Sequence, residues 1–129
     1  MTIGQVWKGT KFTVDRRQGK ASGTVIFHLS GPFTARDMYG SCSPLAFRNT
    51  FEAPAEEGQP VTHILDLTDV PYMDSAGLGF IVSHYVHCKN KGVRVVAAGA
   101  SPRILQLLEM TKTDSLFPMF PTLEEADQP

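Results

Sequence analysis

Alternating apolar and polar positions near the start of the chain predict two β-strands. Phe12 and Val14 alternate with polar residues, and the same spacing recurs over residues 25–29. The polar segment between them contains two glycines, so we expect an antiparallel hairpin. Residues 1–10 show no clear period. We treat them as an N-terminal extension in which Val6 and Trp7 either extend the edge strand or fold over it.

Continuous apolar runs further on predict strands that are buried on both faces of a parallel sheet. The first is Ile64–Leu67, which lies between Pro60 and Pro71, and the second is Val93–Ala97. Each run precedes a stretch with helical spacing, three or four residues apart. The expected buried positions of the two helices are Leu78, Ile81, Val82 and Tyr85, then Ile104, Leu107, Leu108 and Thr111.

The segment 33–60 must carry the chain to a parallel strand, and such a crossover usually contains a helix. Ser43-Pro44 is the favoured helix start, and Leu45, Phe47 and Phe51 are expected in the core. After a short strand within residues 116–120, Thr122 begins a brief terminal helix with the spacing of a capping box. The order predicts an α/β fold and one domain over residues 1–129. We expect a mixed, mostly parallel sheet of four to five strands, with helices mainly on one face.

The junction at residues 70–79 is the leading candidate site. Asp74 and Ser75 are both good N-cap residues, so Ser75 is expected at or beside a helix N-terminus. Free backbone N–H groups and the helix dipole favour negative charge there, which would accommodate a phosphate on Ser75. Gly77 and Gly79 keep the first turns bare, which allows a close approach by another group.

A strand containing Leu65-Asp66-Leu67, followed by Asp74-Ser75-Ala76-Gly77-Leu78-Gly79, resembles the STAS domain, the fold of bacterial anti-sigma factor antagonists. The resemblance implies that Ser75 is phosphorylated by a partner serine kinase that is also the anti-sigma factor, and that a phosphatase reverses this. It implies partner contacts along Asp74, Ser75, Ala76, Gly77, Leu78 and Gly79, with Asp66 as a supporting acid. Asp66 either faces this loop or satisfies backbone N–H groups.

One departure from the family concerns the end of the second strand. Antagonists commonly have an acidic residue just after the glycine there, whereas this chain has Gly31-Pro32-Phe33-Thr34. A different kinase, or none, therefore stays open. The alternative function is a phosphorylation-independent STAS scaffold or adaptor in a signalling assembly or transporter complex, and small-ligand sensing is a third option.

Enzymatic and metal sites were weighed on their residue types. Ser75 with His63 or His84 and Asp66 or Asp74 offers the components of a hydrolase triad, but Met73 stands where a nucleophile elbow needs glycine. His84 and Cys88 have the i, i+4 spacing that can share a metal, with His87 beside them. Without a further cysteine pair or a nearby helical carboxylate, we assign these residues to helix surface and core. We expect no enzyme, cofactor or metal.

Net charge, cysteine content and the length of apolar runs limit the classes of partner and the compartment that we expect. A formal net charge of -1 and a pI near 6.4 give no electrostatic reason to expect nucleic-acid binding. The two cysteines, Cys42 and Cys88, without a signal peptide favour free thiols in a reducing cytoplasm. No apolar run reaches the roughly 20 residues of a spanning helix. We therefore expect no direct membrane insertion and no transporter segment in the same chain.

Overall fold

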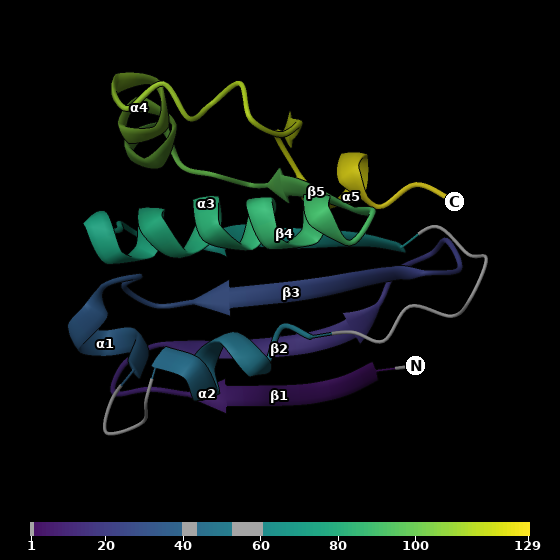
Figure 1. Ribbon diagram of the computed structural model, residues 1–129, viewed down its shortest axis with the longest axis horizontal. Coiled ribbons are helices and arrows are strands. Elements are labelled where there is room, and N and C mark those ends of the chain that lie inside the picture. The colour runs from purple at the N-terminus through teal and green to yellow at the C-terminus, as the bar shows by residue number, and fades with distance from the viewer. Residues whose placement is uncertain (1, 40–43, 53–60) are drawn as a thin grey trace.

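In the part of the chain that the structure describes, six strands form one sheet, and their order in space follows their order in the chain (Figure 1). The computed structural model describes residues 2–39, 44–52 and 61–129. The strands are β1 (Thr2–Lys8), β2 (Thr13–Gln18), β3 (Thr24–Ser30), β4 (Val61–Asp69), β5 (Val93–Ala98) and β6 (Met119–Phe120). The helices are α1 (Ala35–Tyr39), α2 (Pro44–Asn49), α3 (Ser75–Asn90), α4 (Pro102–Met110) and α5 (Leu123–Ala126).

The predicted mixed sheet is confirmed, with a larger number of strands. Strands β1, β2 and β3 pair antiparallel, whereas β3 to β6 are parallel neighbours. The expectation of four to five strands was short because β1 is a full edge strand. Register shifts between Thr2 and Gly4 and between Gln5 and Trp7 break the period of two that would have marked it in the sequence.

The two faces of the sheet carry different layers. Buried residues of α1 to α4, among them Met38, Phe47, Ile81 and Leu108, share one core cluster with one face of the sheet. On the other face, α5 is the only described helix that contributes packing residues to the smaller cluster around Ile64, together with Phe120 of β6. The helices therefore lie mainly on one face, as the sequence predicted.

Local details correct two helix expectations and add one helix. Helix α1 begins after Thr34, whose hydroxyl accepts a hydrogen bond from the Asp37 N–H (3.2 Å). Leu45 is 66% exposed and not part of the core, although Phe47 and Phe51 are buried as expected. Thr111 is the C-cap of α4 and exposed, because the helix ends one residue before it. The expected cap at Ser43 lies outside the described residues.

No helix within residues 2–39, 44–52 and 61–129 combines the length and the apolar character needed to cross a membrane.

Candidate functional site

Ser75 is the first residue of α3 and its side chain is exposed. Asp74 is the N-cap, and its carboxylate accepts hydrogen bonds from the backbone N–H groups of Ala76 (2.9 Å) and Gly77 (3.2 Å). The cap position is therefore filled by Asp74 and not by Ser75. Because the Asp74 carboxylate already accepts from two N–H groups of the first turn, the Ser75 hydroxyl is not the helix cap and is exposed at the start of the helix.

The Asp74 carboxylate also ties the site to a second helix start. Its other oxygen accepts from the N–H of Ala35, the first residue of α1 (3.3 Å). The backbone of Phe33 joins the same loop, since its N–H donates to the Tyr72 carbonyl (3.0 Å) and its carbonyl accepts from the Asp74 N–H (3.3 Å). These bonds hold the segment before Ser75 against the backbone at Phe33.

The two glycines of the site have different surroundings. A Cβ built on Gly77 would lie 2.3 Å from the Phe33 carbonyl oxygen, so this position serves a close internal contact. A Cβ on Gly79 would meet nothing within 4 Å, and Gly79 is exposed. Ala76 and Leu78 are half-buried. Of the predicted partner-contact residues, Asp74, Ser75 and Gly79 thus present the most accessible surface.

Asp66 does not join the Ser75 loop through any contact that the structure describes. One carboxylate oxygen accepts from the N–H (3.1 Å) and hydroxyl (2.6 Å) of Thr68, and the other lies 2.8 Å from His28 Nδ1. Neighbouring Ile64 packs on the α5 side of the sheet, and alternation along β4 places Asp66 there too, away from α3. Of the two roles considered for Asp66, these contacts correspond to satisfying a backbone N–H.

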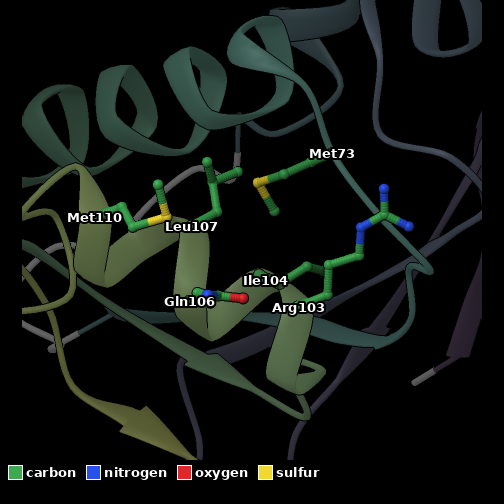
Figure 2. A pocket seen from close by; sticks show the side chains of 6 residues that line it. All are labelled: Met73, Arg103, Ile104, Gln106, Leu107 and Met110. Atoms are coloured by element: carbon green, nitrogen blue, oxygen red, sulfur yellow. The ribbon is translucent and has the colours of Figure 1, made fainter.

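A pocket of about 190 Å³ lies between the loop before Ser75 and α4 (Figure 2). Met73, Leu107 and Met110 give it an apolar wall. Arg103 adds positive charge, and its guanidinium stacks 5.2 Å from the ring centroid of Tyr72, which is 38% exposed. No sequence pattern indicated this pocket, because it depends on how α4 packs against Met73. A flexible, methionine-lined surface with an aromatic edge is typical of protein-binding sites.

The two candidate histidines of a triad lie elsewhere. His63 Nδ1 is 3.1 Å from His84 Nε2, both rings are buried, and the structure describes no hydrogen bond from either to Ser75. Burial lowers the pKa of His63 to about 4 and that of His84 to about 3, so both imidazoles are neutral at pH 7. The described residues therefore do not assemble the triad.

Cys88 completes this buried group, whereas His87 does not. The Cys88 sulfur lies 3.5 Å from His84 Nε2 and 3.7 Å from His63 Nδ1, and burial raises the pKa of its thiol to about 11. His87 turns outward, with Nε2 2.8 Å from a Glu52 carboxylate oxygen. The sequence spacing groups His84 with His87 and Cys88 and gives no sign of His63, although alternation along β4 places His63 on the same face as Leu65 and Leu67.

Comparison with known proteins gives matches of three kinds. The family model of the STAS domain matches residues 17–126. An anti-sigma-B factor antagonist of Listeria monocytogenes is 40% identical over 47 residues, which are 36% of this chain and 41% of the Listeria protein. The match therefore spans less than half of that relative.

Two solved structures have the same fold. The STAS domain of a SulP transporter from Vibrio cholerae superposes with a TM-score of 0.64 and 24% identity, covering 82% of this chain and 79% of that one. The Bacillus cell fate determinant SpoIIAA in its phosphorylated form gives a TM-score of 0.62 and 18% identity, covering 88% and 95%. At these identities the likeness concerns the fold.

Proposed function

The chain belongs to the STAS domain family, and from this premise we propose that it is an anti-sigma factor antagonist-like module controlled by phosphorylation at Ser75. Its partner in this proposal is an anti-sigma factor with serine kinase activity, and a phosphatase restores the unmodified form. The activity is binding and not catalysis. The Listeria relative is an anti-sigma-B factor antagonist, which supports this class of partner.

The observation that carries the proposal is the exposed Ser75 hydroxyl at the first position of a helix whose cap is already occupied. A kinase can reach such a hydroxyl without unfolding the helix. A phosphate there would lie at the positive end of the helix dipole, which suits its charge. Modification therefore leaves the fold intact and changes the surface alone.

Loss of binding then follows from electrostatics at a surface that a partner must desolvate. A phosphoserine adds about -1.5 to -2 charges at neutral pH. The carboxylate of Asp74 lies next to this phosphate in the sequence. The phosphate also covers the small, neutral surface that Ser75 and Gly79 otherwise expose. Repulsion and desolvation together weaken an interface that covers this loop. The adjoining pocket of Met73, Leu107 and Met110 supplies apolar contact area for the same partner.

The test compares three variants of Ser75 with one control variant elsewhere on the surface. The partner is first isolated with the chain from its own cells, identified, and then titrated by calorimetry. We expect Ser75→Ala to bind like the wild type and take up no phosphate, and Ser75→Asp to bind at least about tenfold more weakly, which is about 1.4 kcal/mol. The asparagine of Ser75→Asn has nearly the same shape as aspartate but no charge, so this variant should keep most of the wild-type affinity. Ser115→Asp, at an exposed position after α4, controls for added charge elsewhere.

Thermal melts accompany the titrations. Aspartate suits a helix start, so an unchanged melting temperature for Ser75→Asp would assign lost binding to the interface. The adaptor hypothesis expects Ser75→Asp to bind as well as Ser75→Asn. Equal affinities of these two, with no phosphate on Ser75 by mass spectrometry of protein from its own cells, would exclude the switch.

A further inference from the structure

His63, His84 and Cys88 form a buried cluster that the proposed regulation at Ser75 does not use. His63 comes from β4, and the other two come from successive turns of α3. Their exposed fractions are 3%, 4% and 2%. Their three ligand atoms, Nδ1, Nε2 and Sγ, all lie within 4.8 Å of one another. Convergence of three potential metal ligands from two elements is uncommon in a core otherwise built of aromatic and aliphatic side chains.

The separations of these atoms match those of ligands around one metal ion. Zinc lies about 2.0–2.1 Å from histidine nitrogen and about 2.3 Å from cysteine sulfur, so tetrahedral ligand atoms are about 3.3–3.6 Å apart. The measured separations are 3.1 Å between the nitrogens, and 3.5 and 3.7 Å from the sulfur to each nitrogen. An ion can therefore enter with shifts of a few tenths of an ångström.

No hydrogen bond to His63 Nε2 fixes the tautomer of this ring among the described residues. His63 Nε2 is buried and has no hydrogen-bond partner among the described residues. If His63 carries its proton on Nδ1, the lone pair of Nε2 is unpartnered; if it carries the proton on Nε2, that N–H is unpartnered. His63 Nδ1 and His84 Nε2 face each other at 3.1 Å, so one of them carries the hydrogen that joins them. When that proton moves to the opposite nitrogen of its own ring, both lone pairs can face a cation with no net loss of a proton from the imidazoles.

We propose that His63 Nδ1, His84 Nε2 and Cys88 Sγ bind a single Zn²⁺ ion. The thiol loses its proton to solvent on binding, and the thiolate and two imidazoles fill three positions, leaving one for a non-protein ligand. The ion joins β4 to α3, the helix that begins at Ser75. Its net positive charge is partly offset by the Glu52 carboxylate, which interacts electrostatically with all three groups.

The surroundings set the expected strength of the site. The rings of Phe27, Phe51 and Phe80 pack around the two imidazoles, with centroid distances of 5.1 Å for Phe27 to His63 and 5.5 and 5.7 Å for Phe51 and Phe80 to His84. They exclude competing water. A zinc-bound His63 carries its proton on Nε2, where no described acceptor orients the ring. Loss of such an outer-shell partner usually lowers metal affinity by about 10- to 100-fold, so we expect moderate affinity.

Cobalt substitution in the chelator-stripped chain tests the proposal. We expect one Co²⁺ per chain, with a thiolate-to-cobalt charge-transfer band and the intense visible bands of tetrahedral cobalt, and displacement by Zn²⁺. Cys88→Ser should remove the charge-transfer band. His84→Gln should lower the affinity for Zn²⁺ by more than about 100-fold, which exceeds the effect of losing an outer-shell partner. Matched controls are Cys42→Ser, the only other cysteine, and His87→Gln on the same helix. Both should keep the spectrum and affinity.

Zinc-edge X-ray absorption of the wild-type chain does not depend on how any variant folds. A shell of one sulfur and light-atom ligands that include two imidazoles is the expected result. A shell of oxygen and nitrogen alone, a charge-transfer band that persists in Cys88→Ser, or a band that disappears in Cys42→Ser would overturn the site. Absence of stoichiometric Co²⁺ binding to folded wild-type chain would do the same.

Discussion

At the scale of single residues, Gly77 and Gly79 provide a test of how closely α3 is held. The Gly77→Ala methyl would meet the Phe33 carbonyl oxygen, and that backbone also bonds to Tyr72 and Asp74, so it cannot yield freely. We expect a loss of about 1–3 kcal/mol in the free energy of unfolding. Gly79→Ala adds a methyl in open space and should gain about 0.5–1 kcal/mol from helix propensity.

Urea unfolding of both variants beside the wild type gives this comparison directly. The two changes are chemically identical and two residues apart on one helix. A Gly77→Ala chain as stable as the wild type would mean that the Phe33 segment is not packed on α3.

Residue-level signals predicted part of the candidate site and missed another part. Asp74 and Ser75 were identifiable because capping is a local property of sequence. The side of the sheet on which Asp66 lies was not, since the apolar run of β4 covers both faces and carries no alternation to read. The contact between His63 and His84 could not be predicted either, because these residues are far apart in the sequence and meet only through the packing of α3 on β4.

At the scale of elements, α4 is the helix in which the pattern of apolar residues best predicts which side chains are buried. Leu108 is 1% exposed and Met110, two residues on, is 75% exposed. We expect Leu108→Ala to lower the free energy of unfolding by about 2–4 kcal/mol, because it removes a buried side chain and leaves a cavity. Met110→Ala on the same helix should change it by no more than about 0.5 kcal/mol. Denaturant melts with equal losses in both variants would contradict the buried face assigned to α4.

The pattern of α3 was less informative for a physical reason. The expected buried face was Leu78, Ile81, Val82 and Tyr85, but the buried residues are Gly77, Ile81, His84 and Cys88. Only Ile81 is common to both sets, although Leu78 and Tyr85 pack at the edge of the core. Glycine, histidine and cysteine are weak hydrophobic markers, so the spacing of apolar residues predicts the wrong buried face for this helix. The helix itself and its cap were predictable because they rest on local chemistry.

At the scale of the whole molecule, the edge strand β1 determines whether the chain unfolds as one unit. Trp7, the only tryptophan, lies on β1, stacks edge-on against Phe47 at 5.1 Å, and donates to the Met38 carbonyl. It therefore belongs to the shared core. We predict that tryptophan fluorescence and far-ultraviolet circular dichroism give coincident denaturation curves, the signature of cooperative two-state unfolding.

The measurement is made with a metal chelator present, so that bound ions do not add a second transition. Leu108→Ala serves as the control, because a core change far from β1 should shift both curves equally. A tryptophan transition that comes before the circular dichroism transition would show that β1 detaches before the rest of the sheet unfolds.

The strict correspondence between strand order in the sheet and strand order in the chain bears on how the fold can be assembled. Each described strand after β1 has its immediate predecessor as a neighbour, so none of them must be inserted between two that have already paired. During synthesis, β1, β2 and β3 can close as short-range hairpins before β4 leaves the ribosome. The register that places Thr24 opposite Thr62 then closes the longest loop between neighbouring strands. That step carries the largest entropic cost of chain closure, and it is the one that brings the two halves of the sheet together.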